Sequence, residues 1–149
     1  MDIGTEIPQG NEKEQLSRLK VLQVEDEDIL RRLVSRDLTG LGISHVSAES
    51  AIKAREIFNE DDSFNVLITD FDMPGMNGAE LIRELKKKKP DLLTMLFSGR
   101  AEGDEDVNKY LGEHKYDFYE TKPVDLSTLE ERLKVFNKRL IEREREEIT

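Results

Sequence analysis

Apolar segments with strand character alternate five times with helical segments along this chain. Three of them, at Val21–Val24, Val66–Thr69 and Leu92–Phe97, are almost continuously apolar, which is typical of strands covered on both faces. Weaker strand candidates lie at Ile43–Ser47 and Tyr116–Thr121. Strands that alternate with helices favour parallel pairing through right-handed helical crossovers. The alternation therefore predicts a doubly wound α/β fold with helices on both faces of one parallel sheet.

The first two helical segments are amphipathic. Between Leu30 and Leu41 apolar residues recur at helical spacing, and arginines occupy the opposite side (Arg31, Arg32 and Arg36). Glycines at 40 and 42 end this segment. Ser50 is a suitable N-cap for the next helix, whose apolar positions run from Ala51 to Phe58.

Three helices are expected in the second half of the chain. Asn77 and Glu80 have capping-box spacing and begin a helix that ends before Pro90. The stretch 101–115 carries a thin apolar stripe and predicts a short, mobile helix. The last helix begins at Asp125, and its apolar residues follow a spacing of three and four as far as Leu140.

Length and periodicity divide the chain into three parts. A chain of 149 residues most simply forms one domain with a single core. Residues 1–18 lack apolar periodicity and are expected to be a disordered N-terminal tail. Residues 19–141 form the folded domain, and residues 142–149 form a charged helical extension beyond the last apolar helix position.

Composition excludes several classes of protein. The chain has no cysteine, so it has neither disulfides nor thiolate metal ligands, which fits a cytoplasmic protein. It lacks an apolar run of membrane-spanning length. The formal net charge of -10 argues against general attraction to nucleic acids or anionic lipids. We expect protein partners, with no direct contact to nucleic acid or membrane.

Side chains with complementary chemistry follow four of the predicted strands. Glu25 and Asp26 follow the first, Asp70 the third, Ser98 the fourth and Lys122 the last. The carboxyl ends of parallel strands lie at the same edge of a sheet, so these residues can converge there.

Such a cluster is suited to phosphoryl chemistry. Neighbouring carboxylates repel one another, and a divalent cation relieves that repulsion. Oxygen ligands without His or Cys favour Mg²⁺ or Mn²⁺. An aspartate can attack phosphorus when a metal and Lys122 neutralise the phosphoryl oxygens, and Ser98 can donate a hydrogen bond to one of them. Pro123 is compatible with a rigid cis turn that fixes Lys122.

Together these motifs resemble the response-regulator receiver domain of two-component signalling, of the chemotaxis type. The resemblance covers about residues 19–140 and rests on four separated motifs in the family's order. It implies a flavodoxin-like (βα)5 fold with a five-stranded parallel sheet of order 2-1-3-4-5. It also implies that Asp70 is the phosphoacceptor, that Glu25 and Asp26 orient Mg²⁺, and that Ser98 and Lys122 contact the phosphoryl group.

The resemblance implies a switch as well. Asp72 would give its backbone carbonyl to the metal, and Tyr119 matches the aromatic switch position. When Ser98 moves toward the phosphoryl group, Tyr119 rotates inward and affinity for a partner changes. The donor would be a histidine kinase or a phosphotransfer domain. The protein would be a monomer or weak dimer and a phosphorylated signalling domain, not an enzyme beyond its own phosphotransfer and autodephosphorylation.

The chain departs from the family pattern at two places. Glu25 replaces the commoner first aspartate, and His114-Lys115-Tyr116 replaces a small-residue pair before the last strand. The side chains of Asp72 and Arg100 are expected to flank the site, where they can tune the phosphoryl lifetime.

Three alternatives remain open at this stage. A haloacid-dehalogenase-like phosphatase also places an Asp-x-Asp nucleophile after a strand, although the order of motifs argues against it. A pseudo-receiver would bind partners without phosphate. The lysine run 86–89 is expected to be a solvated helix end, and nucleic-acid binding there is the less favoured interpretation.

Overall fold

The computed structural model describes residues 16–148. Residues 1–15 of the expected N-terminal tail therefore lie outside the described residues. For its last three residues the expectation is wrong: Leu16–Arg18 form a 3-10 turn (η3), and Leu16 is buried. Its side chain joins the core beside the last helix, α6 (Leu126–Ile148), and Asn65 fixes the turn by donating from Nδ2 to the Arg18 carbonyl at 2.8 Å.

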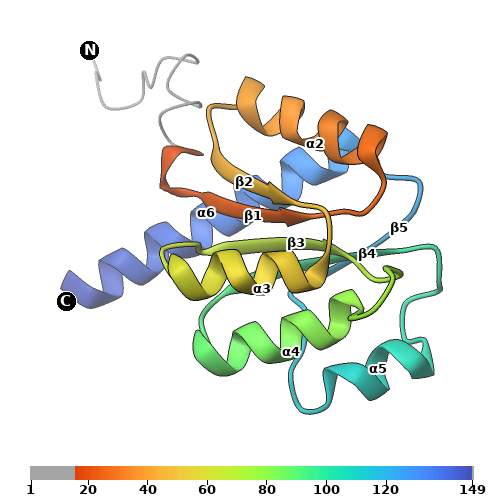
Figure 1. The fold of residues 1–149 in the computed structure, drawn as a ribbon. Coiled ribbons are helices and arrows are strands. Elements are labelled where there is room, and N and C mark those ends of the chain that lie inside the picture. Colours follow the sequence, from red (N-terminus) through yellow and green to blue (C-terminus); the bar gives the residue numbers. More distant parts are fainter. Residues whose placement is uncertain (1–15, 149) are drawn as a thin grey trace.

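The described chain forms one five-stranded parallel sheet of order β2-β1-β3-β4-β5, as predicted (Figure 1). Its strands are β1 (Lys20–Val24), β2 (Ser44–Ala48), β3 (Val66–Asp70), β4 (Leu93–Ser98) and β5 (Phe118–Thr121). β5 differs most from expectation, since it omits Tyr116 and Asp117; the Asp117 carboxylate accepts from the Thr94 amide at 2.7 Å near the start of β4. β2 and β4 each begin and end one residue later than expected.

The helices lie on both faces of the sheet (Figure 1). They are α2 (Asp28–Gly40), α3 (Ala51–Glu60), α4 (Gly78–Lys88), α5 (Glu105–Leu111) and α6 (Leu126–Ile148). α3, α4 and α5 cover one face, and α2 and α6 cover the other. This arrangement confirms the doubly wound fold.

A separate hydrophobic core fills each layer. One core packs Leu22 and Leu67 of the sheet against α3, α4 and α5. The other packs Val66 and Met95 against α2 and α6. Alternate residues of a strand point to opposite faces, so the nearly continuous apolar runs supply both cores.

Local sequence signals set the helix boundaries. The capping box at α4 is present: Asn77 Oδ1 accepts from the Glu80 amide at 2.8 Å, and Glu80 accepts from the Asn77 amide at 3.0 Å. Ser50 caps α3, and Asp125 accepts from the Ser127 amide at 2.9 Å at the start of α6. α5 has seven residues and ends at Gly112, which has a φ of 63°.

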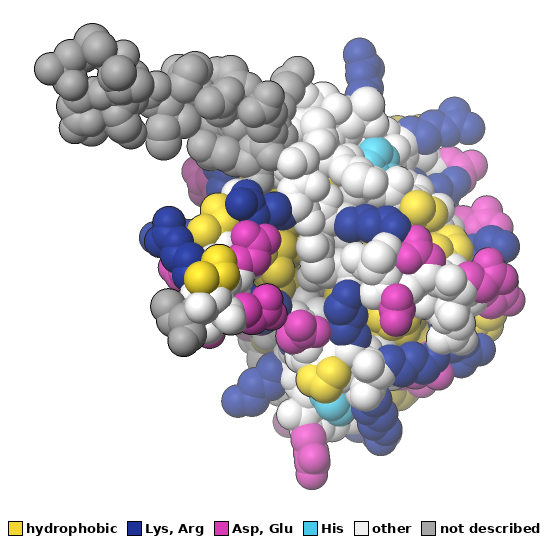
Figure 2. All heavy atoms as spheres, turned by 90° about the vertical axis from the view of Figure 1, so that its left-hand side faces the viewer, with side chains coloured by type: hydrophobic (Ala, Val, Ile, Leu, Met, Phe, Trp, Pro, Cys, Tyr) yellow, Lys and Arg dark blue, Asp and Glu magenta, His cyan; other side chains and the backbone are white. Residues whose placement is uncertain are grey.

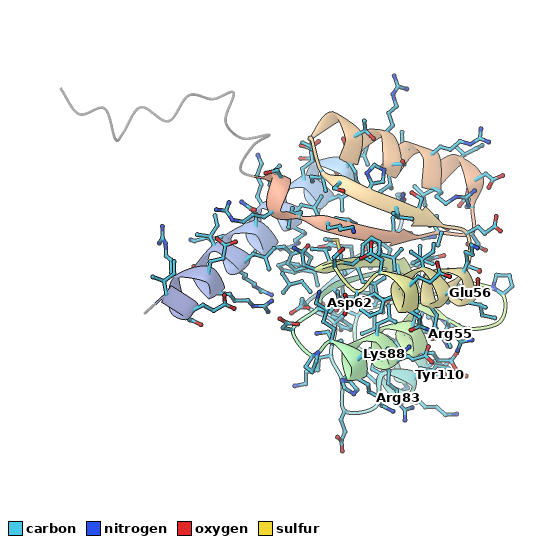
Figure 3. The ribbon with its side chains drawn as sticks, turned by 60° about the vertical axis from the view of Figure 1, so that its left-hand side comes forward. Arg55, Glu56, Asp62, Arg83, Lys88 and Tyr110 are labelled. Atoms are coloured by element: carbon cyan, nitrogen blue, oxygen red, sulfur yellow. The ribbon has the colours of Figure 1, made fainter. Side chains whose placement is uncertain are left out.

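Polar contacts join α3 to α4. Arg55 of α3 pairs with Glu84 of α4 at 3.3 Å, and Lys88 donates to the Asn59 side chain. Arg55 and Lys88 are labelled in Figure 3, which shows them on these two neighbouring helices. These contacts fix the layer that carries the loop after β3.

The last helix continues beyond the final apolar position predicted for it. Arg18 Nε donates to both carboxylate oxygens of Glu144, at 3.0 and 3.2 Å. Arg143 donates to the Asp91 carbonyl at 2.8 Å. The C-terminal turns of α6 therefore contact the body of the protein through charged groups.

Candidate functional site

The register of the sheet brings the predicted strand-end residues to one edge. Val24 pairs with Thr69, Asp70 with Phe97, and Ser98 with Thr121. The residues that follow these positions include Glu25, Asp26 and Lys122, so the predicted convergence is confirmed. The chemical roles assigned to them remain predictions.

Lys122 is the centre of the cluster. Its ammonium lies 3.1 Å from Asp70 Oδ1 and 3.3 Å from Glu25 Oε1. The Lys122 amide donates to the Ser98 carbonyl at 2.8 Å, and the peptide bond to Pro123 is cis, as the sequence suggested. One cation thus bridges two carboxylates from different strands.

The three acids form a cluster suited to a hard divalent cation. One carboxylate oxygen from each of Glu25, Asp26 and Asp70 lies within 4.8 Å of the others. Asp70 and Glu25 are only 4% and 5% exposed, whereas Asp26 is exposed. A set of oxygen donors with one side open to solvent fits Mg²⁺ or Mn²⁺, which retain water ligands.

Burial dominates the electrostatics of the acids. Desolvation raises the pKa of Glu25 to about 7, with a further contribution from Asp70. Desolvation also raises the pKa of Asp70, although Lys122 opposes this shift. Burial disfavours the charged form of Lys122, but the attraction of Asp70 and Glu25 is greater and raises the pKa of its ammonium. The acid cluster therefore holds excess negative charge that a cation would relieve.

Ser98 and Tyr119 both contact the backbone of Arg100. Ser98 is fully buried, and its Oγ accepts from the Arg100 amide at 3.0 Å. Tyr119 is partly buried against the core on the α3 to α5 side, and its hydroxyl donates to the Arg100 carbonyl at 2.7 Å. The tyrosine ring also packs against Tyr116 at 5.3 Å between centroids.

Asp72 and Arg100 flank the site, as expected. The exposed Asp72 carboxylate pairs with the Arg100 guanidinium at 3.5 Å. The assignment of the Asp72 backbone carbonyl as a metal ligand remains a prediction. A cavity of about 480 Å³ lies beside this pair and is lined by Phe71, Asp72, Met73, Pro74, Gly75, Asn77, Arg100, Asp106 and Tyr110.

Two residues that support the site were missed by sequence reasoning. Arg31 was assigned to the solvent side of its helix, but its guanidinium donates to the Glu25 carbonyl at 2.9 Å. Gly78 begins α4 so close to β3 that a Cβ atom there would lie 2.0 Å from the Asp70 carbonyl oxygen. The place of Gly78 directly after the Asn77 cap is a sequence signal that could have been used. The Arg31 contact depends on the conformation of a long side chain, and no sequence signal indicates it.

Comparison with known proteins identifies the class. The sequence matches the response regulator receiver domain family over residues 21–134. A chemotaxis protein CheY homolog of Campylobacter jejuni is 34% identical over 90 residues, covering 56% of this chain and 69% of that protein. A cyclic di-GMP phosphodiesterase of Thermotoga maritima is 32% identical over 117 residues, covering 78% of this chain but 30% of the enzyme.

Solved structures agree with this match. A response regulator receiver domain protein of Clostridium thermocellum has a TM-score of 0.72 and 28% identity, covering 81% of this chain and 95% of that one. The Thermotoga maritima response regulator TrrA, solved with Mg²⁺ and BeF, has a TM-score of 0.68 and 27% identity, covering 79% and 98%. TrrA was also solved in complex with the histidine kinase ThkA, with a TM-score of 0.67 and 26% identity, covering 79% and 97%.

The sheet order and the acidic edge define a signalling domain of two-component systems. This chain belongs to the response regulator receiver domain family. Within residues 16–148, no helix is both long and apolar enough to cross a membrane.

Proposed function

We propose that this receiver accepts a phosphoryl group on Asp70 and changes its affinity for a protein partner. The Asp70 carboxylate oxygen attacks phosphorus and forms an acyl phosphate, while the bond to the donor breaks and its electron pair stays with the donor. The observation that carries the proposal is the position of the Lys122 ammonium, 3.1 Å from Asp70 Oδ1 and 3.3 Å from Glu25 Oε1 in the acid cluster.

The surrounding residues suit this transfer. Lys122 offsets the charge that spreads over the phosphoryl oxygens, and the Ser98 hydroxyl has a donor proton available for one of them. A divalent cation held by Glu25, Asp26 and Asp70 would supply further charge neutralisation when bound. The low exposure of Asp70 also limits the access of water to the acyl phosphate.

A histidine kinase or a phosphotransfer domain is the proposed donor. The related protein TrrA has been solved in complex with a histidine kinase, which supports a kinase as partner here. We further propose that the domain has no substrate turnover beyond its own phosphotransfer and autodephosphorylation. Membership of the receiver family favours this interpretation over a haloacid-dehalogenase-like phosphatase.

Intact protein mass spectrometry after treatment with acetyl phosphate and Mg²⁺ tests the proposal. We expect one labile phosphate on the original protein, none on Asp70→Asn, and normal labelling of the control variant Asp62→Asn. Equal labelling of all three proteins would remove Asp70 from its role. Absence of labelling, together with no Mg²⁺-dependent binding of beryllofluoride, would instead support the pseudo-receiver interpretation.

The lysine run has intramolecular partners, which weakens the nucleic-acid alternative. Lys89 donates to the carbonyls of Asp62 and Phe64 at 2.8 and 2.7 Å, and Lys86 pairs with Asp117 at 3.3 Å. Acidic and basic side chains are interspersed on the side of the molecule shown in Figure 2. A phosphate-binding surface requires clustered positive charge that is available to the ligand.

A further inference from the structure

Arg100 connects the two predicted switch residues through its own peptide groups. Its amide donates to Ser98 Oγ at 3.0 Å, and its carbonyl accepts from the Tyr119 hydroxyl at 2.7 Å. Both side chains therefore depend on where the backbone of one loop residue lies. A displacement of this residue would alter both hydrogen bonds together.

The Arg100 side chain fixes that backbone from two directions. Toward the loop after β3, the guanidinium lies 3.5 Å from Asp72 and 5.2 Å from the centroid of the Phe71 ring. Toward the start of α5, it lies 3.0 Å from Asp106 and 3.6 Å from Asp104. The guanidinium therefore holds the loop after β4 between the phosphoacceptor loop and α5.

Tyr119 already lies inward in this structure. It packs against the buried core on the α3 to α5 side, and its hydroxyl is bonded to the Arg100 carbonyl. We propose that Arg100 is a positioning residue whose ion pairs fix its carbonyl as the acceptor for Tyr119, and so favour the inward rotamer before any phosphoryl group arrives. The consequence for signalling rests on the function proposed above, whereas the effect on the Tyr119 rotamer does not.

The chemistry of arginine suits this role. A guanidinium has five N–H donors in a fixed plane, so it can engage several carboxylates and still stack on an aromatic ring. Its partners Asp72 and Asp106 are exposed, which makes the pairs sensitive to ionic strength. High salt should therefore loosen the hold of Arg100 without changing any residue.

Acrylamide quenching of tyrosine fluorescence tests the proposal on the full chain. The chain has three tyrosines and no tryptophan, so replacing Tyr110 and Tyr116 by phenylalanine leaves Tyr119 as the only emitter. In this background, without beryllofluoride, we expect Arg100→Met to raise the quenching constant about twofold. Arg100→Lys should give an intermediate value, because it keeps the charge but loses the planar fork.

Two comparisons separate this role from a general loss of structure. Arg32→Met changes an exposed arginine on α2 and should leave quenching unchanged. Sodium chloride at about 1 M should raise quenching in the parent background and leave Arg100→Met unaffected, since its ion pairs are already absent. If Arg100→Met does not fold, Asp106→Asn removes the 3.0 Å pair alone and should show a smaller increase. The proposal is overturned if folded Arg100→Met shows the same quenching as the parent protein. If Asp106→Asn has to be used in place of Arg100→Met, equal quenching of that variant and the parent overturns it.

Beryllofluoride binding in the presence of Mg²⁺ tests whether the position of Tyr119 is coupled to the phosphorylation site. With Tyr119 less well positioned, the apparent affinity of Arg100→Met should fall about fivefold, because part of the binding free energy is used to restore the inward rotamer. If the parent protein fails to bind beryllofluoride, the proposed function is wrong, and the quenching comparison still decides the role of Arg100. An unchanged affinity in a variant with increased quenching would show that Tyr119 is not coupled to the site.

Discussion

Asp70 lies at 4% exposure with Lys122 as its nearest cation, yet burial raises its pKa above the ordinary value. The charged form is therefore disfavoured in the folded state relative to the unfolded state. In wild-type protein the contribution of Asp70 to stability is greatest below the unfolded pKa of about 3.8 and is lost as pH rises through the higher folded value.

Asp70→Asn should therefore stabilise the metal-free protein. We expect the free energy of unfolding to rise by about 1–2 kcal/mol at pH 8, because a disfavoured buried charge is removed while Lys122 keeps Glu25 as its partner, and by less at pH 4. Urea unfolding in the presence of a chelator measures the change. A variant that is less stable than the original at pH 8 would show that the Lys122 contact outweighs burial.

Gly78 positions Asp70 by allowing the backbone of α4 to approach that of β3 closely. A Cβ at this position would meet the Asp70 carbonyl at 2.0 Å, so α4 or the end of β3 must shift. We expect Gly78→Ala to lower the free energy of unfolding by about 1–3 kcal/mol and to reduce labelling of Asp70.

Gly40 provides the matched control for this change. A Cβ at Gly40 meets nothing within 4 Å, and alanine there should be neutral or slightly stabilising through its helix propensity. Equal effects of the two substitutions in urea unfolding would contradict the steric explanation for Gly78.

At the scale of single residues, sequence reasoning found the groups that converge at one edge of the sheet. Asp70, Ser98 and Lys122 lie at or just after strand ends, and this position was sufficient to predict that they meet. The contacts of Arg31 and Arg100 were not predictable in the same way, because long side chains choose partners in three dimensions. The ion pair with Asp106 depends on how α5 lies against the loop before it.

The pairing of α2 with α6 contains an unfavourable contact between acids. Desolvation raises the pKa of Asp37 on α2, and the charge of Glu130 on α6 raises it further. The contribution of Asp37 to stability is therefore fully present below its ordinary pKa of 3.8 and is lost as pH rises above that value.

Asp37→Asn should relieve this repulsion. We expect the variant to gain a few tenths of a kcal/mol at pH 8, roughly the scale of partly exposed charge pairs, and to show less change between pH 4 and pH 8. Glu130→Gln should produce the same direction of change. Thermal unfolding at the two pH values distinguishes this from a helix-propensity effect, which would be independent of pH.

Elements were predictable where local signals were strong. The capping box fixed α4 at Asn77, and the spacing of three and four identified α6. The prediction for Leu16–Arg18 was wrong because a three-residue turn has no periodicity. The burial of Leu16 depends on packing beside α6, which is far away in the sequence. The start of β5 was placed two residues too early, because this edge strand has few apolar residues to mark where it begins.

Across the whole molecule, the boundary placed at residue 141 is open to a direct test. The buried residues of α6 all precede it, and the turns beyond it contact the body through Arg143 and Glu144. Deleting residues 142–149 should lower the free energy of unfolding by about 1 kcal/mol or less and preserve a single cooperative transition, since exposed ion pairs contribute little. Glu144→Gln should account for part of the loss. A broad or multistep urea transition in the shortened chain would place the boundary further along the helix.

The fold as a whole followed from the order of strands and helices, since few topologies satisfy right-handed crossovers in a single sheet. The pattern of residues alone did not give the sequence of strands across the sheet, and that order came from the resemblance to a family. The same alternation of strands and helices is compatible with other strand orders of doubly wound sheets. It does not specify which strands become the neighbours of β1.

The length of α6 has a mechanical consequence. The helix starts four residues after Lys122 and extends along the molecule to Ile148 on the opposite side (Figure 1), about 33 Å at a rise of about 1.5 Å per residue. The buried residues of this stiff helix lie in its first half, and its last turns contact the body through charged side chains, so it can work as a lever. A tilt of a few degrees beside Lys122 would move the far end by roughly 2–3 Å. A partner bound at the C-terminal end of α6 would therefore be displaced further than the residues beside Lys122.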